Sequence, residues 1–160
     1  MMCRQILWML AIAALSASRA HAADSSEAAT IIALERGALD RWGKGDPQGY
    51  LDLYANDVTY IDPIHEKRLD GIEPIRKMLV SFTGKIKIDR YEILNPKVQR
   101  SGGLAVLSYN LVNYRKRPDG GFATLRWNAT AVYRRTGNTW KIVHNHWSYT
   151  KPELKQPSPE

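Results

Sequence analysis

Hydrophobic residues recur with two different spacings along the chain. Between Asp24 and Gly84 they recur every three or four residues, whereas from Lys85 to Tyr149 apolar and polar residues alternate. The first spacing is typical of amphipathic helices, and alternation is typical of strands with one buried face. The pattern therefore predicts helices in the first part of the chain and a sheet in the second.

The helical part contains three predicted helices. Asp24 and Glu27 have the spacing of a capping box, which favours a helix start at this point. Pro74 falls in the first turn of the third helix, where its missing N–H breaks no helical hydrogen bond. The predicted helices cover residues 24–42, about 48–54 and about 72–83.

A short strand over Val58–Asp62 and a return strand over His65–Leu69 are predicted between the second and third helices. Four longer strands follow, separated by turns rich in glycine, and they span roughly 86–99, 103–117, 122–135 and 139–149. This order predicts an α+β fold with about three N-terminal helices packed on the concave face of a curved antiparallel sheet. Such an arrangement leaves a conical cavity between the two layers.

The last predicted strand has two faces with different chemistry. One face carries Trp140, Ile142, His144, His146 and Ser148, and the other carries Lys141, Val143, Asn145, Trp147 and Tyr149. The first face begins apolar and ends polar, as expected of a core that becomes a pocket. Large apolar side chains on the second face would be exposed in a monomer. Val143, Trp147 and Tyr149 therefore predict a homodimer contact through the outer sheet face.

Residues 1–22 have the composition of a secretory signal peptide. Arg4 precedes an apolar run over Ile6–Leu15, and Ala20-His21-Ala22 fits a small-x-small cleavage site. The apolar run is too short for a resident membrane helix, so no membrane anchor is predicted. Cleavage near Ala22 predicts an exported protein, periplasmic or secreted, with one domain over residues 23–150.

Export changes how the composition is interpreted. Cys3 is the one cysteine and lies in the predicted signal, so the mature chain has no thiol. Of the 23 Lys and Arg residues, Arg4 and Arg19 leave with the signal, and the remaining 21 against 16 acidic residues give a net charge of +5. These basic residues are dispersed along the strands, which favours a solvated sheet face over a nucleic-acid partner. Residues 151–160 contain three prolines and predict a disordered tail.

Three stretches resemble one protein superfamily: Asp46–Pro63, Asp70–Ile72, and Trp140–Ser148 with the pattern Trp-x-x-Val-His-x-His-x-Ser. Over about residues 27–149 the chain resembles the NTF2-like superfamily, the cone-shaped α+β fold of SnoaL-like polyketide cyclases and ketosteroid isomerases. It is most similar to bacterial proteins related to the calcium/calmodulin-dependent kinase association domain. The resemblance implies the fold, but this fold hosts enzymes, binding modules and oligomerisation domains alike.

One position departs from the family pattern. Association-domain relatives often carry an arginine two residues before the aromatic residue of the penultimate strand, directed into the cavity. That aromatic residue matches Tyr133, so the position is Ala131 here. The resemblance therefore does not imply a carboxylate-binding arginine at this place.

His144 and His146 are the sharpest candidates for chemistry. At positions i and i+2 of one strand face, their side chains are expected roughly 6.5–7 Å apart. A neutral imidazole can act as a general base or acid near pH 7, or hydrogen-bond a carbonyl group. The pair has three open interpretations: pocket residues that contact a ligand, structural histidines, or metal ligands, for which no third ligand stands at a recognisable spacing.

Asp62 ends a strand whose other inward residues are Val58 and Tyr60. A buried carboxylate is unfavourable unless it is paired, so an inward Asp62 predicts an acid/base group or a partner for a histidine. The alternative is a carboxylate that caps residues 63–65 or lies at the rim. Ketosteroid isomerase-like proteins use an aspartate to abstract a proton, but no motif assigns that role to Asp62.

Aromatic side chains with a polar tip suit a small, partly apolar ligand, and they suit a plain core equally well. The candidate ligand-binding residues are Trp42, Tyr50, Tyr54, Tyr60, Tyr109, Trp127 and Tyr133.

Two functions from different classes follow. The first is an exported protein that binds a small, partly apolar molecule, with cofactor-free isomerase, cyclase or hydrolase chemistry if it is catalytic. His144 or His146 would then carry the proton and Asp62 would be the partner. The second is a non-catalytic dimerisation or interaction module. No cofactor is predicted, because the chain has no dinucleotide fingerprint or phosphate loop. No metal is predicted, because no third ligand accompanies the two histidines at a recognisable spacing.

Overall fold

The computed structural model describes residues 25–150, and the chain divides between Thr30 and Ile31 into two compact units. The described part of the first unit, residues 25–30, is helical. The predicted signal peptide over 1–22 and the predicted tail over 151–160 lie outside the described residues. Both stay predictions, as does the domain boundary at residue 23.

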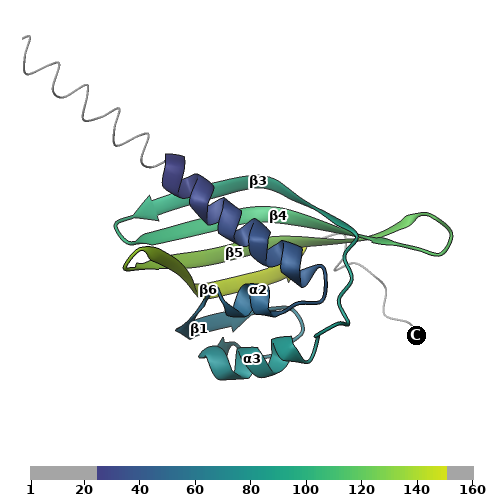
Figure 1. Ribbon diagram of the computed structural model, residues 1–160, viewed down its shortest axis with the longest axis horizontal. Coiled ribbons are helices and arrows are strands. Elements are labelled where there is room, and N and C mark those ends of the chain that lie inside the picture. The colour runs from purple at the N-terminus through teal and green to yellow at the C-terminus, as the bar shows by residue number, and fades with distance from the viewer. Residues whose placement is uncertain (1–24, 151–160) are drawn as a thin grey trace, which may run out of the picture. The chain divides into compact units, whose positions relative to one another are not determined.

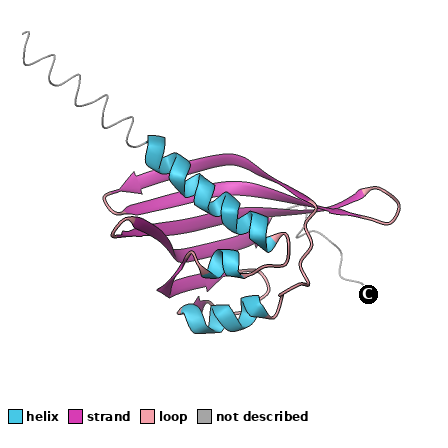
Figure 2. Cartoon of the chain, in the orientation of Figure 1, coloured by secondary structure: helices cyan, strands magenta, loops and turns pink. Residues whose placement is uncertain are grey.

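The second unit combines helices with a six-stranded sheet, which confirms the predicted α+β class (Figures 1 and 2). Its first helix covers residues 31–42. The other elements are α2 (Gln48–Leu51), β1 (Tyr54–Ile61), β2 (Leu69–Asp70), α3 (Ile72–Val80), β3 (Arg90–Ser101), β4 (Leu104–Lys116), β5 (Phe122–Thr136) and β6 (Thr139–Tyr149).

The strands lie in the order β2-β1-β6-β5-β4-β3. The four long strands form the predicted antiparallel meander. β1, however, pairs with β6 in parallel, with Tyr60 opposite Asn145 and Ile61 opposite His146. The expectation of a wholly antiparallel sheet is therefore wrong for this pair. Parallel neighbours need a long crossover, which α3 and the other three long strands supply here.

Several predicted boundaries shift because of pairing with distant strands. The second helix ends at Leu51 rather than near residue 54, since Tyr54 already pairs with Ile142 of β6. The return strand is reduced to Leu69–Asp70. The strand expected from residue 86 begins at Arg90. These shifts leave loops over 62–68 and 81–89, and both loops contribute to the pocket described below.

Curvature of the sheet is associated with irregular pairing in β3 and β6. In β3 the register shifts between Leu94 and Lys97, where Asn95 has a positive φ of 51° and Pro96 has no N–H to donate. Such bulges bend a strand and increase its twist. β3 is also an edge strand, where a proline interrupts no inner ladder.

The core lies between the helices and one face of the sheet. From the first helix of the second unit, Ile31, Ala38 and Leu39 are buried in it. α3 adds Ile75 and Leu79, which fall four residues apart on one helix face. Packing of these apolar stripes against the sheet positions the helices, because burial of apolar surface is the main favourable term in folding.

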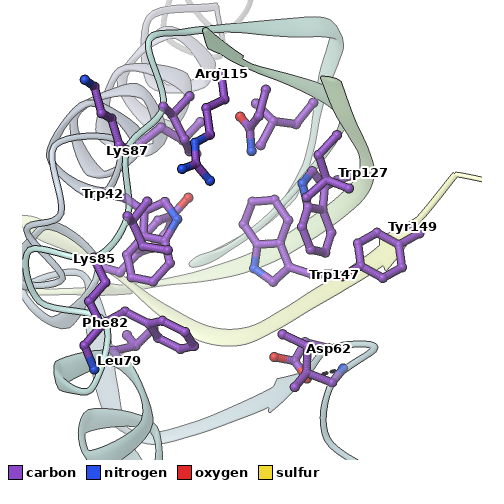
Figure 3. A pocket seen from close by; sticks show the side chains of 18 of the residues that line it. Trp42, Asp62, Leu79, Phe82, Lys85, Lys87, Arg115, Trp127, Trp147 and Tyr149 are labelled. Atoms are coloured by element: carbon purple, nitrogen blue, oxygen red, sulfur yellow. Dashed lines mark hydrogen bonds between the residues drawn. The ribbon is translucent and has the colours of Figure 1, made fainter. Parts of the chain in front are cut away.

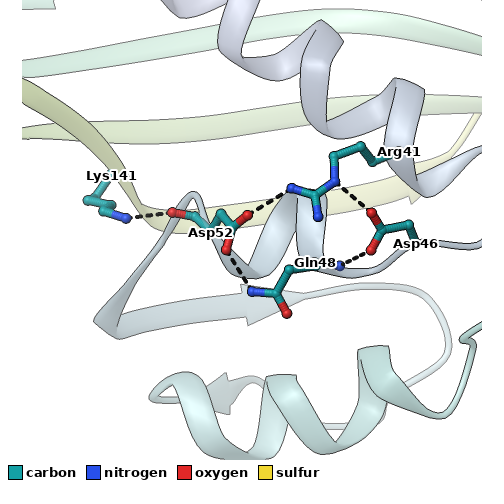
Figure 4. A network of polar contacts seen from close by, with 5 residues as sticks. All are labelled: Arg41, Asp46, Gln48, Asp52 and Lys141. Carbon is teal, nitrogen blue, oxygen red and sulfur yellow. Dashed lines mark hydrogen bonds and ion pairs between the residues drawn. The ribbon is translucent and has the colours of Figure 1, made fainter.

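A polar network fastens the end of the first helix to α2 and β6 (Figure 4). The guanidinium of Arg41 donates to Asp46 at 2.6 Å and to Asp52 at 2.8 Å. The side chain of Gln48 donates to the second carboxylate oxygen of Asp52, and Lys141 donates to the Asp52 backbone carbonyl. Hydrogen bonding to Arg41 holds the pKa of Asp46 below its usual value.

Candidate functional site

A pocket of about 430 Å³ lies between the helices and the sheet of the second unit (Figure 3). Ligand sites for small molecules commonly have volumes of roughly 300–1,000 Å³. Its wall takes residues from the first helix of the unit, α3, the loop before β3, and strands β4 to β6. Most of the lining is aromatic or aliphatic, with few polar groups among it.

Aromatic rings pack edge to face around one side of the pocket. The ring centroid of Trp147 lies 6.1 Å from that of Trp127, with an interplanar angle of 84°, and 6.3 Å from that of Tyr50, with an angle of 88°. At the end of β6, the Tyr149 ring lies 4.4 Å from Trp127, centroid to centroid, and is tilted by 38°. Edge-to-face pairs of this kind are favoured by the ring quadrupole and fix ring orientation. The pocket wall is therefore held in shape by its own side chains.

A β-bulge at Val143 decides which β6 residues reach the pocket. Tyr133 of β5 pairs with Ile142, whereas the preceding Val132 pairs with His144, so Val143 is the extra residue on β6. After a one-residue insertion, the alternation of side chains along a strand continues in the opposite phase. The inward face consists of Trp140, Ile142, Asn145, Trp147 and Tyr149.

The predicted faces of β6 are thus corrected beyond the bulge. His144 and His146 are not among the pocket-lining residues. His144 is half-buried, and its Nδ1 lies 2.8 Å from the Thr59 hydroxyl. Burial lowers the pKa of His144, and the neighbouring His146 and Arg68 add to that shift. His146 is exposed.

The same correction applies to the predicted dimer surface. Trp147 and Tyr149 line the pocket and so are not available on the outer face of the sheet. The outer face of β6 carries His146 and Ser148, and Ser148 accepts a hydrogen bond from Asn128 of β5. Asn128 in turn accepts one from Asn110 of β4 at 2.8 Å. Polar groups therefore occupy the surface where apolar residues were expected.

The loop before β3 forms the wall opposite the sheet, and glycine contacts hold it in place. Ile88 donates its N–H to Gly43 O, and Gly84 donates to Gly45 O, both at 2.9 Å. Gly45 has φ +79°, and a Cβ on it would lie 2.9 Å from the Gly84 Cα, so a larger residue cannot be accommodated there. Lys85 and the following residues to Ile88 line the pocket.

Asp62 is the acidic side chain of the lining, and only 8% of its surface is exposed. Its Oδ1 accepts hydrogen bonds from the N–H groups of Ile64 and His65, at 3.0 and 2.9 Å, and also lies 2.9 Å from His65 Nδ1. The capping interpretation of Asp62 is therefore present in the structure together with its placement in the pocket wall. Burial and the adjacent Asp62 carboxylate raise the pKa of Tyr60.

A second carboxyl group, Glu35, lies fully buried beneath the pocket. Tyr50 and Tyr109 donate hydrogen bonds to its Oε1 at 2.9 and 2.7 Å, and Tyr133 donates to Oε2 at 2.5 Å. Burial raises the pKa of Glu35, and the three phenol hydrogen bonds oppose this shift. Burial also raises the pKa of all three phenols, and the Glu35 charge adds to it. Tyr50 is shared, because its ring also lines the pocket.

The predicted site residues are thus distributed over three places. The pocket wall contains Asp62, Trp42, Tyr50, Tyr54, Tyr60 and Trp127. Tyr109 and Tyr133 belong to the buried cluster around Glu35 rather than to the pocket. His144 and His146 lie on β6 outside the lining. The catalytic and ligand-binding roles predicted for these residues stay predictions.

Two groups of residues in and below the pocket were not predicted from the sequence. Glu35 was not singled out, although it falls four residues after Ile31 and three before Ala38, in the middle of the apolar stripe. Asn113 and Arg115 of β4 line the pocket, and they continue the buried face that includes Leu111. In each case the sequence did carry a signal: a polar residue stands where the hydrophobic repeat of the helix or strand would place an apolar one.

Within residues 25–150, no group of three or more His, Cys, Asp or Glu side chains is placed to hold a metal ion. Over the same residues, no helix combines the length and the apolar character needed to cross a membrane.

The family model of the calcium/calmodulin-dependent protein kinase II association domain matches residues 27–151. The chain belongs to this family. This match confirms the resemblance to association-domain proteins that the three sequence stretches indicated. No curated protein matches it.

Solved structures similar to this association-domain protein extend the comparison. A crystal structure from Parabacteroides distasonis, provisionally described as a ketosteroid isomerase, is 36% identical, with TM-score 0.67, over 77% of this chain and 87% of that one. The association domain of C. elegans CaMKII is 22% identical, with TM-score 0.68, over 79% and 97%. An NTF2-like superfamily protein from Salmonella enterica is 21% identical, with TM-score 0.63, over 84% and 99%. The last two show similarity of fold alone.

Proposed function

We propose that the chain binds a small, largely apolar molecule in the pocket between its helices and its sheet. The observation that carries this proposal is the pocket itself, about 430 Å³ in volume and walled by aromatic side chains with few polar groups. The edge-to-face packing of Trp127, Trp147 and Tyr50 supports it, because a wall preorganised in this way loses little freedom when a ligand enters.

The polar groups in the wall are consistent with this role. Among residues 25–150, Asp62 is the one carboxylate that the lining offers to a bound molecule, and the phenol of Tyr60 lies beside it. If a bound carbonyl compound exchanges a proton with the protein, these two groups are placed to take part. Chemistry of this kind requires no cofactor. The proposal does not assign proton transfer to His144 or His146, because both are outside the lining.

The test uses a neutral aromatic probe, methyl 2-naphthoate, titrated into the purified chain by isothermal calorimetry. Binding is expected for the unmodified chain. Ala123→Trp should abolish it, because Ala123 lines the pocket and a tryptophan there fills the space. Phe122→Trp is the matched control, because Phe122 is the adjacent residue but is not in the lining. Absence of probe binding, or equal loss in both variants, would contradict the proposal.

A second candidate function is self-association, and it rests on the family match to an association domain. Structures of similar fold include a CaMKII hub from S. rosetta. The homodimer predicted from the sequence stays a proposal, but the surface assigned to it needs revision, since Trp147 and Tyr149 line the pocket. Light scattering after size-exclusion chromatography at micromolar concentration tests it, and a monomer mass would reject it.

The proposal includes export, which rests on residues 1–22 alone. Mass spectrometry of the chain recovered from a secreting bacterial host should show an N-terminus near Ala23. A cytoplasmic chain that keeps Met1 would reject this part.

A further inference from the structure

One wall of the pocket changes in polarity along β4. Leu111, Asn113 and Arg115 follow one another at every second position, so they share the inward face of the strand. Their exposure increases in that order, from buried Leu111 through half-buried Asn113 to exposed Arg115. The facing residues of β5 are all apolar: Trp127, Leu125 and Ala123. The wall is therefore apolar inside, neutral and polar in the middle, and cationic near the β4–β5 turn.

The positive charge of Arg115 at that end has no counterpart among residues 25–150. Figure 3 shows the guanidinium of Arg115 directed into the cavity, whereas the side chains of Lys85 and Lys87 extend away from it. Arg134, by contrast, is bound bidentately by Asp57 on the surface. Over residues 25–150, Arg115 has neither an ion pair nor a hydrogen-bond acceptor for its side chain.

Lys85 and Lys87 also belong to the lining, but their side chains extend away from the cavity, so within residues 25–150 Arg115 is the lining cation directed into it. Over the same residues, the carboxylate in the lining is that of Asp62. The Oδ1 atom of Asp62 is already engaged by the loop after it. A guanidinium beside an apolar wall binds carboxylate and related anions by paired hydrogen bonds, and partial exclusion of water strengthens them.

A second, independent observation concerns Asn113. Its side-chain oxygen is buried and accepts no hydrogen bond from any residue between 25 and 150. A buried acceptor without a donor is unfavourable, and such groups are rare unless they bind something else. Asn113 lines the pocket two residues from Arg115. The wall therefore offers an acceptor next to a cation.

We propose that the ligand is an amphipathic organic anion whose polar end carries a hydrogen-bond donor next to the charged group. Its apolar body lies against Leu111 and Trp127, its N–H or O–H group donates to Asn113 Oδ1, and its anionic group accepts from Arg115. This inference rests on the proposed binding function and names the class of molecule that the same pocket selects.

The charge preference is tested with two probes that share one ring system, 2-naphthoate and its neutral methyl ester, titrated into the full chain by calorimetry. The unmodified chain should bind the acid at least about tenfold more tightly than the ester, as expected of a charge-assisted pair of hydrogen bonds. Arg115→Gln should remove this preference while ester binding is retained. Lys116→Gln removes the same charge one position along the strand, outside the lining, and should keep the preference.

The donor preference is tested with N-(2-naphthoyl)glycine and its ester-linked analogue (2-naphthoyloxy)acetate, which differ in one N–H group. The unmodified chain should bind the amide more tightly by several-fold, and Asn113→Ala should bind both equally. Retained binding of methyl 2-naphthoate shows that this variant still forms the pocket. A second variant, Asn113→Leu, should lose the same preference.

The outcomes separate this inference from the proposed function. If neither the acid nor the ester binds, the proposed function fails, and this inference fails with it. If the ester binds as tightly as the acid, the pocket binds ligands but the anion assignment is wrong. Equal loss of preference in Arg115→Gln and Lys116→Gln would mean that overall charge, rather than Arg115, selects the acid. Equal binding of amide and ester by the unmodified chain would remove Asn113 from the site.

Discussion

Tyr133 donates a 2.5 Å hydrogen bond from β5 to Oε2 of Glu35, a carboxyl group with no exposed surface. Tyr50 and Tyr109 occupy the other oxygen, so phenols from α2, β4 and β5 meet on one helix residue. The contacts join segments that are 15, 74 and 98 residues away from Glu35 in the chain. These directional contacts therefore tie the helix to α2 and to the sheet at one point.

Removing one donor from this cluster should destabilise the fold. Tyr133→Phe leaves Oε2 without its phenol in a fully buried site, and we expect a loss of about 1–3 kcal/mol in the free energy of unfolding. Urea denaturation measures it. Tyr91→Phe is the control, because it removes a similar hydrogen bond from Tyr91 to Asp40 at an exposed site, where the loss should be much smaller. Equal effects of the two variants would contradict this role.

The ionisation of Glu35 should be visible in the pH dependence of stability. Burial raises the pKa of Glu35 above its ordinary value of 4.5, so the folded chain holds this proton more tightly than the unfolded chain. The contribution of Glu35 is then fully present below that ordinary value and is lost as the pH rises through the folded pKa.

Glu35→Gln isolates this effect, because glutamine does not titrate and the other carboxyl groups cancel in the difference. The free energy of unfolding of the unmodified chain minus that of the variant should fall from about pH 4.5 upward. Urea denaturation of both proteins between pH 4 and pH 8 measures it. A constant difference would show that the three phenols balance burial, and a difference that rises with pH would show that they outweigh it.

The exchange of faces on β6 predicts opposite results for two neighbouring substitutions. Tyr149→Ala removes a lining ring and should weaken binding of methyl 2-naphthoate by roughly two- to tenfold. His146→Ala should leave the affinity unchanged, since His146 is exposed outside the lining. Calorimetry on both variants shows which face of β6 lines the pocket. Weaker binding in the His146 variant alone would mean that alternation continues through β6 without a bulge.

Asn145 should limit stability rather than support it. Its side chain is 1% exposed, and neither its nitrogen nor its oxygen has a hydrogen-bond partner within residues 25–150. Asn145→Val replaces this amide with an apolar strand former and should raise the free energy of unfolding by about 1 kcal/mol or more. Thermal and urea denaturation measure the change. A clear loss of stability would mean that the amide is satisfied in the folded protein.

Much of the fold could be predicted because its signals are local. The change from helical spacing to alternation near Lys85 identified the order of helices and strands, and the final-strand pattern over Trp140–Ser148 indicated the family. Turn residues located the hairpins to within a few residues. The parallel pair of β1 and β6 was beyond such reasoning, because it joins Tyr54 to Ile142 without any local signal.

The site was predicted less well, for two physical reasons. Alternation was followed through β6 as if each residue had one partner, and the extra residue Val143 reverses every side chain after it. No local residue type marks that bulge. Glu35 was overlooked because the apolar members of its helix were counted and the acidic residue between them was not. A carboxyl group on an apolar stripe is unfavourable without partners, so it indicates buried donors nearby.

The bulge at Val143 also means that strand pairing is itself a determinant of ligand selectivity on β6. If Val143 took a regular place in the alternation, His144, His146 and Ser148 would face the pocket in place of Asn145, Trp147 and Tyr149. The bulge therefore replaces an imidazole-bearing wall with an aromatic one without any change of side-chain identity. Among proteins of this fold, a comparison of pocket chemistry must therefore count residues along the last strand before it matches them.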